Sequence, residues 1–275
     1  MVTGSLRSAL DLLRAPAAWL PGITSGVLFA SFLLLQFFSG TFIAERLWVL
    51  EMVVFPFFIA GLMHLAKTGE RSLSSFISGG KTGYFRVLLP SLIVFFGLIL
   101  TLFLLLIPLA LIGLAETAFL FVAMSASFTV LLFTFFYDAA AIIEGRKVFD
   151  AVRRSVEFVL QQTRACMIFY LIALAIFFSV LFFTLMLWTA ALYDRLEPVA
   201  AMSAADIQSF SPSRLNELLG SDGILVTAFL AFIGVTLVVS LIYSFKACFF
   251  RDYAGAPAAI AVQGEYDEKG RWYKY

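Results

Sequence analysis

Residues 87–109 read VLLPSLIVFFGLILTLFLLLIPL, an apolar run without a single charged side chain. A helix needs about 20 such residues to cross the hydrocarbon core of a bilayer. Comparable runs recur along the chain, and they place six transmembrane helices at about 17–39, 46–66, 87–109, 115–141, 165–193 and 224–250. The sequence therefore predicts an all-α fold, a polytopic integral membrane bundle of six transmembrane helices.

The composition supports the same class. Hydrophobic residues make up 62% of the 275 residues and charged residues 13%, whereas soluble domains have roughly 45–50% and about 25%. The net charge of +1 gives no basic stripe, so nucleic acid is not an expected partner. We expect a single membrane domain over residues 1–275, with the lipid bilayer as its main partner and no appended soluble enzyme.

The basic residues show a strong bias between the two sides of the predicted spans. Of the 19 Lys and Arg residues, one side holds just Arg46, Arg195 and Arg214. Cytoplasmic loops of membrane proteins carry the excess of Lys and Arg. The bias predicts a multi-pass protein of the cell membrane with both termini in the cytoplasm. It places the loop 194–223 outside and the tail 251–275 inside.

The segments that precede the odd-numbered spans share a helical spacing of apolar residues. These segments are 5–13, 72–78 and 147–162. They are predicted to be short amphipathic helices in the cytoplasmic interface, with basic residues toward lipid headgroups. The alternative is a connecting helix packed on the bundle. Gly79 and Gly80 are expected to end the second segment.

The same order of amphipathic helix, outward span and inward span begins near residues 5, 72 and 148. This order is consistent with a parallel internal repeat, and chance similarity is the alternative.

The loop 194–223 carries signals for short helices. Ser203 and Asp206 match a capping box. Ser211 followed by Pro212 is a helix start, and Gly220 is a helix end. We expect these helices to form a small cap over the outer face. The cap could gate the protein or recognise a ligand; the alternative is that it only covers the bundle.

Ionisable residues within spans are the default candidates for function, because charge is costly in lipid. Asp138 and Lys246 lie at similar depth near the inner ends of their spans, and each is flanked by aromatic residues. We predict an ion pair between them; the alternative is that each reaches headgroup water alone. Glu51 and Glu116 could form an acidic cluster or mark the membrane edge, and His64 is expected to be interfacial.

The sequence is compatible with two functions. The leading hypothesis is a non-enzymatic module that organises lipid or a partner membrane protein. Arg153 and Arg154, followed by Arg71 and Lys81, are its candidates for contact with anionic headgroups, and pure topology determination is the alternative role of these residues. A transporter or permease component is the second hypothesis. It would need a polar cavity lined by Asp138, Lys246, His64 or Glu51.

Enzyme motifs are missing from the sequence. There is no His-Glu-x-x-His, no Gly-rich phosphate loop and no G-x-S-x-G, and the single His disfavours triads and zinc sites. Cys166 and Cys248 are expected to be small packing residues, because a reducing compartment disfavours a disulfide. We therefore expect no enzymatic activity, no metal and no cofactor.

The segment AIIEGRKVFDAVRRSVEFV (141–159) resembles a feature of uncharacterised six-helix membrane protein families of archaea and bacteria. Those families are similar to the membrane domain attached to some glycerophosphodiester phosphodiesterases. The matching positions are Glu144, Gly145, Ala151, Arg154 and Ser155. The stretches FIAGLM (58–63), SLSSF (72–76) and GKTGYF (80–85) look like the matching region after the second span. The resemblance implies the six-helix architecture, and the phosphodiesterase activity does not carry over because its catalytic domain is absent from the match.

Overall fold

The computed structural model describes residues 2–111, 116–200, 202, 211–255, 264–266 and 272–274. Within these ranges the chain is almost wholly helical, and six helical segments are long and apolar enough to cross a membrane. They are Pro16–Phe38, Thr41–Thr68, Leu73–Leu111, Ala118–Ile143, Thr163–Ala191 and Arg214–Tyr253. The prediction of an all-α bundle with six membrane spans is confirmed. The tail adds one antiparallel pair of short strands, β1 (Gly264–Tyr266) and β2 (Trp272–Lys274).

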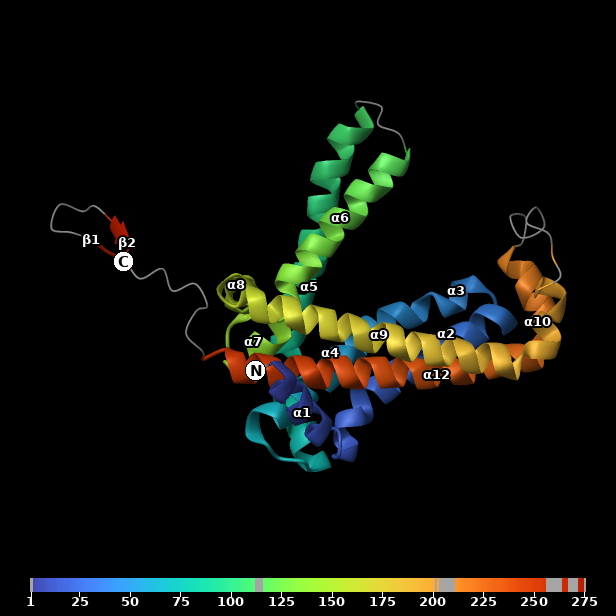
Figure 1. Cartoon of the computed structure of the whole chain (residues 1–275), viewed down its shortest axis with the longest axis horizontal. Coiled ribbons are helices and arrows are strands. Elements are labelled where there is room, and N and C mark those ends of the chain that lie inside the picture. Colours follow the sequence, from blue (N-terminus) through green and yellow to red (C-terminus); the bar gives the residue numbers. More distant parts are fainter. Residues whose placement is uncertain are drawn as a thin grey trace.

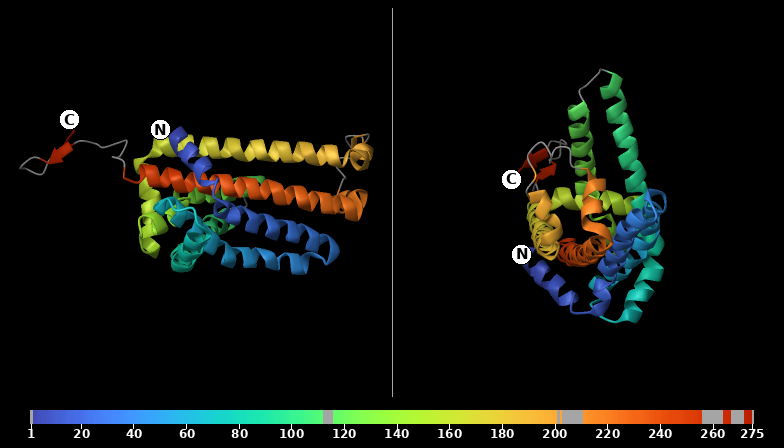
Figure 2. Two further views of the ribbon diagram at one scale, coloured as in Figure 1. Left: turned by 90° about the horizontal axis from the view of Figure 1, so that it is seen from below. Right: turned by 90° about the vertical axis from the view of Figure 1, so that its right-hand side faces the viewer.

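Four long helices run side by side and form the main bundle (Figures 1 and 2). They are α2 (Leu20–Phe38), α4 (Arg46–Thr68), α9 (Thr163–Ala191) and α12 (Pro212–Tyr253). Helix α12 packs against the other three. Two short elements connect to them, the 3-10 helix η1 (Pro16–Trp19) before α2 and α3 (Thr41–Ala44) before α4.

The two ends of this bundle differ. One end, here called the α8 end, carries α1 (Val2–Leu12), α7 (Tyr137–Ile143) and α8 (Val148–Gln161), together with the last turns of α12 (Figure 1). The opposite end carries α10 (Tyr193–Ala200). The predicted helices at 5–13 and 147–162 thus exist as α1 and α8. Helix α1 packs on α12, and the Ser5 hydroxyl donates a hydrogen bond to Asp252.

Helices α5 (Leu73–Leu111) and α6 (Glu116–Thr134) form a hairpin that leaves the main bundle sideways (Figure 1, and right panel of Figure 2). The first half of α5 packs against α4, whereas the hairpin beyond it has few buried residues. Phe121 and Phe128 of α6 are 72% and 69% exposed. Lipid tails are as apolar as these side chains, so burial against other helices is not required for them.

The predicted helix end at Gly79 and Gly80 is wrong, because α5 continues through both residues. Their role is close packing against α4. A Cβ atom at position 79 would clash with the side chain of His64, and one at position 80 would lie 2.8 Å from Phe57. Small residues allow helix backbones to approach closely in membranes. The segment 72–78 is accordingly the first turns of a long helix instead of a separate interfacial helix.

The predicted span 115–141 is interrupted near its C-terminal end. Helix α6 stops at Thr134, and α7 starts at Tyr137. The Ser155 hydroxyl of α8 fills the gap, because it accepts a hydrogen bond from Phe136 N (2.9 Å) and donates one to the Phe133 carbonyl oxygen (2.9 Å). A helix can be broken at membrane depth where a side chain satisfies the freed backbone groups.

The predicted short helix after Ser211 is confirmed. The Ser211 side chain accepts a hydrogen bond from Arg214 N, and Pro212 takes the first helical position. The left-handed φ of 62° at Gly220 then kinks α12 before it enters its long membrane segment. The expected capping box at Ser203 and Asp206 lies outside the described residues.

A cluster of aromatic rings forms the core of the α8 end. Phe169 of α9 lies 4.6 Å from Phe245 between ring centroids, and Phe158 of α8 lies 4.7 Å from Phe250. All four rings are almost fully buried. Offset and tilted ring pairs of this kind stabilise beyond the area that they bury. The cluster fixes α8 across the ends of α9 and α12.

Candidate functional site

Asp138 of α7 and Lys246 of α12 form a buried ion pair. The Lys246 Nζ atom lies 2.7 Å from Asp138 Oδ2, and the two side chains are 2% and 3% exposed. The other carboxylate oxygen of Asp138 accepts a hydrogen bond from Ala139 N at 2.7 Å. The structure therefore brings together the two residues that the sequence analysis expected to pair, and neither of them reaches headgroup water alone.

Aromatic rings surround the ammonium group of this pair. Lys246 Nζ lies 4.2 Å from the ring centroid of Phe135, 4.7 Å from Tyr243 and 5.9 Å from Tyr137. The negative face of an aromatic ring attracts a cation at such distances. Charge pairing and ring contacts together offset the cost of placing a lysine in an apolar bundle.

A cleft of about 350 Å³ opens beside the pair, where α4, α5, α7 and α12 meet. Asp138 is part of its wall, and so is Glu51 of α4. The further polar groups are Ser91, Tyr137 and Tyr243, and the remaining lining is mostly apolar residues of α4. The sequence analysis expected Asp138 and Glu51 as candidate cavity residues. It missed Ser91 and the two tyrosines. The available signal for the tyrosines was their position, since Tyr137 directly precedes Asp138 and Tyr243 lies three residues before Lys246.

Glu51 is half-buried, and no hydrogen bond or ion pair joins it to any residue within the described ranges. The side chain of Glu116 lies outside the described residues, so the expected cluster of these two carboxylates stays a prediction. His64 lies away from the cleft and contacts Gly79 instead. Lys246 lies behind Asp138 and is not part of the lining.

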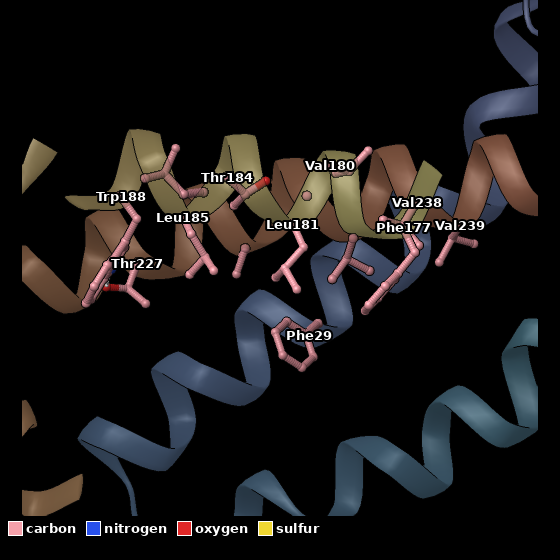
Figure 3. Close-up of a pocket in the computed structure, with 14 residues that line it drawn as sticks. Phe29, Phe177, Val180, Leu181, Thr184, Leu185, Trp188, Thr227, Val238 and Val239 are labelled. Carbon is pink, nitrogen blue, oxygen red and sulfur yellow. Dashed lines mark hydrogen bonds between the residues drawn. The ribbon is translucent and has the colours of Figure 1, made fainter. Parts of the chain in front are cut away.

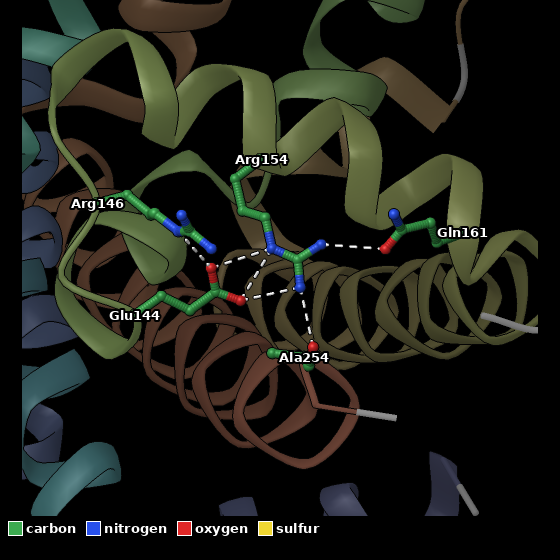
Figure 4. A network of polar contacts seen from close by, with 5 residues as sticks. All are labelled: Glu144, Arg146, Arg154, Gln161 and Ala254. Carbon is green, nitrogen blue, oxygen red and sulfur yellow. Dashed lines mark hydrogen bonds and ion pairs between the residues drawn. The ribbon is translucent and has the colours of Figure 1, made fainter. Parts of the chain in front are cut away.

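A second polar network lies at the α8 end and centres on Glu144 and Arg154 (Figure 4). The Arg154 guanidinium pairs with Glu144 at 2.9 Å, and it donates hydrogen bonds to the Ala254 carbonyl oxygen (2.9 Å) and to Gln161 (3.2 Å). Arg146 pairs with the same carboxylate at 3.0 Å, and this hydrogen bond and the charge of Glu144 raise the pKa of Arg146.

The expected contact of Arg154 with lipid headgroups does not fit this geometry. Its side chain is just 13% exposed, and its donors are used to join α8 to the end of α12. Arg153 differs, because its side chain is 79% exposed and pairs with Glu157 alone, at 2.7 Å. Arg71 and Lys81 are also exposed. These three residues remain available for headgroups.

A cavity without charged lining residues lies between α2, α9 and α12 and measures about 470 Å³ (Figure 3). Phe29, Leu181 and Trp188 are among its lining residues, and the Trp188 indole donates a hydrogen bond to Thr227 at 2.8 Å. No charged residue lines it. The cavity offers space for an apolar chain and no group for acid–base or ligand chemistry.

Cys166 and Cys248 are both buried and free, as expected for packing residues. The described part of the chain holds no group of three His, Cys, Asp or Glu residues that could bind a metal ion.

The fold and these sites define a multi-pass helical membrane protein with a polar cleft beside a buried ion pair. Comparison of the chain with protein-family models, curated protein sequences and solved structures gave no match.

Proposed function

We propose that this protein is a non-enzymatic module of the cell membrane that organises anionic lipid around its α8 end. The proposal rests on the exposed apolar and basic side chains on the outer face of α8. Phe149 and Leu160 on this face are 74% and 56% exposed, and Arg153 lies on the same face of the helix. Exposed apolar and basic side chains on one helix face suit insertion at the boundary between headgroups and acyl chains.

The buried face of α8 explains why its outer face is fixed in place. Ala151, Ser155 and Phe158 are almost fully buried against the bundle. Because the network of Arg154 and Glu144 ties the same helix to α12, α8 presents Arg153 in a defined direction. Each basic residue near an anionic surface contributes about 1 kcal/mol to attraction. Arg71, Lys81 and Arg153 together could enrich anionic lipid at this end.

We propose that the α8 end lies in the cytoplasm, because Lys and Arg are concentrated on that side of the predicted spans. Cysteine labelling in intact cells tests this orientation. Native Cys166 and Cys248 are buried and serve as the unreactive background. We expect a membrane-impermeant reagent to label Asp206→Cys and to leave Gly270→Cys unlabelled. The reverse pattern would refute the orientation.

Lipid enrichment is measured on the full chain in nanodiscs that contain phosphatidylcholine and a minor fraction of labelled phosphatidylglycerol. We expect phosphatidylglycerol to be enriched near the protein and the enrichment to fall in Arg71→Gln/Lys81→Gln/Arg153→Gln. Arg214→Gln is a control for the position of the charge, because Arg214 is an exposed arginine near the opposite end. Equal enrichment in the triple variant and the control would remove the basis of the proposal.

A transporter or permease component is the second candidate, and the cleft lined by Glu51 and Asp138 favours it. Both functions are compatible with the resemblance to six-helix membrane families. Uptake of a solute into proteoliposomes that depends on Glu51 would favour transport, whereas lipid enrichment that is independent of Glu51 supports the first candidate.

A further inference from the structure

Glu51 of α4 is a carboxylate of the cleft without a cationic partner among the described residues. It lies within the second membrane span and lines the cleft, and no residue in the described ranges neutralises it. Asp138, the other carboxylate of the cleft, is already paired with Lys246. The cleft therefore carries one uncompensated acidic group. A carboxylate at membrane depth is costly unless a proton, water or a cation meets it.

The residues around Glu51 favour a cation as the group that meets its carboxylate. Trp48, Phe55, Tyr137 and Tyr243 contribute aromatic rings to the cleft. Two of these rings already receive a cation in the folded chain, because Lys246 Nζ lies 4.7 Å from Tyr243 and 5.9 Å from Tyr137. Aromatic faces around an ammonium group are a recurring means of binding amines and quaternary ammonium ions.

Other ligand classes fit the cleft poorly. An anion would meet the carboxylates of Glu51 and Asp138. A calcium ion takes six or more oxygen ligands, and the described residues offer no group of three acidic or metal-binding side chains. A neutral apolar molecule would leave Glu51 unpaired. A cavity of about 350 Å³ lies at the small end of ligand sites, which span about 300–1,000 Å³.

We propose that the cleft between α4, α5, α7 and α12 binds an organic ammonium ion with a small apolar body. The carboxylate of Glu51 pairs with the ammonium group, and the rings of Trp48 and Tyr243 contact its substituents. The same chemistry is present in a free amine and in the choline group of a lipid. The inference is independent of the exposed face of α8 and of the enrichment of anionic lipid there.

Binding is measured on the full chain in dodecyl maltoside, a detergent without ammonium groups, by equilibrium dialysis of benzyltrimethylammonium. Neopentylbenzene, the uncharged carbon isostere, is the ligand control. We expect the cation to bind at least about tenfold more tightly than the isostere, because the carboxylate of Glu51 and the aromatic faces attract the cation and not the uncharged isostere. Equal binding of the two ligands would show an apolar pocket and overturn the proposal.

Variants test the named residues. Glu51→Gln removes the charge–charge attraction and is expected to weaken binding of the cation by about tenfold or more. Glu45→Gln is the matched control, because Glu45 is exposed and does not line the cleft. Trp48→Leu removes one ring and is expected to weaken binding about threefold or more. If Glu51→Gln fails to fold, as judged by size-exclusion chromatography, the affinity of Trp48→Leu for the cation tests the proposal. Wild-type affinity in a folded Glu51→Gln or Trp48→Leu protein would contradict the proposal.

Competition distinguishes the two sources of the ammonium group. Displacement of the probe by dihexanoylphosphatidylcholine would assign the site to a lipid headgroup, and displacement by benzylamine alone would assign it to a free amine. Displacement by neither would contradict an ammonium site. Loss of cation binding in Glu51→Gln with unchanged enrichment of phosphatidylglycerol would support the cleft separately from the function proposed for α8.

Discussion

Ser155 of α8 bonds directly to Phe136 in the break between α6 and α7, with 2.9 Å between the serine Oγ atom and the phenylalanine nitrogen. The same hydroxyl donates a hydrogen bond to the carbonyl oxygen of Phe133. One side chain thus satisfies two backbone groups that the interrupted helix frees. The break in turn sets the direction of α7, which carries Asp138 to Lys246. Ser155 therefore connects α8 to the break that precedes Tyr137 and Asp138, two lining residues of the cleft.

Ser155→Ala should destabilise the protein. The side chain is fully buried, so its removal takes the hydrogen-bond partner from the buried Phe136 N–H and from the part-buried Phe133 carbonyl group, at a cost of about 1–3 kcal/mol. A lower midpoint of thermal unfolding in detergent is the expected result. Ser78→Ala is the control, because Ser78 is exposed in α5. An equal midpoint for the two variants would show that the bridge adds no stability.

The ion pair should behave as a coupled unit. Lys246→Met leaves the buried carboxylate of Asp138 without its partner, and the loss of one partner of a buried pair costs about 3–5 kcal/mol. Asp138→Asn/Lys246→Met removes both charges and should lose less stability than Lys246→Met alone. Lys147→Met, a change at an exposed lysine, should have little effect. Additive losses in the double variant would contradict the coupling.

The positions of the spans and of the ion pair follow from different kinds of sequence signal. Long apolar runs predict the spans because no other environment suits them. Asp138 and Lys246 could be paired from the sequence, since two opposite charges at similar depth in lipid stabilise each other. The sequence does not predict that the α5–α6 hairpin leaves the main bundle. Phe121 and Phe128 suit lipid and protein surroundings equally, so an apolar helix gives no signal for its partner.

The face of α8 shows the same difficulty. The segment 147–162 has apolar residues at helical spacing, yet the most deeply buried positions of α8 include the small residues Ala151 and Ser155. Hydrophobicity alone does not identify the side of a helix that meets protein, because apolar side chains suit lipid and protein surroundings alike. Close approach to the bundle selects small residues instead. Arg154 lies beside these small residues and is nearly buried with them. The sequence analysis did not predict its burial, because it had no signal for the side of α8 that meets protein.

Gly79 should tolerate no side chain. A Cβ atom there would clash with His64 of α4, and overpacking of a tight contact costs about 1–3 kcal/mol. Gly79→Ala is expected to lower the thermal midpoint. Gly97→Ala is the matched control in the same helix, because no heavy atom lies within 4 Å of a Cβ built at Gly97. Equal midpoints would show that α4 and α5 separate without cost.

Adjacent arginines of α8 should have opposite roles. Arg154 is nearly buried and joins Glu144 to the Ala254 carbonyl group, so Arg154→Gln should destabilise the protein by about 1.5–3 kcal/mol, the range for hydrogen bonds to charged groups. Arg153 is 79% exposed, and exposed pairs contribute about 0–1 kcal/mol. Arg153→Gln should therefore leave the thermal midpoint almost unchanged.

The two variants should also separate in lipid enrichment. We expect Arg153→Gln to lower the enrichment of phosphatidylglycerol in nanodiscs, because it removes a charge that points away from the protein. Arg154→Gln should lower stability, with enrichment per folded molecule retained, since its charge is already used by Glu144. Because both changes remove one positive charge from the same helix, net charge cannot explain a difference. Equal effects of the two variants on enrichment would show that the outward direction of Arg153 is irrelevant to lipid.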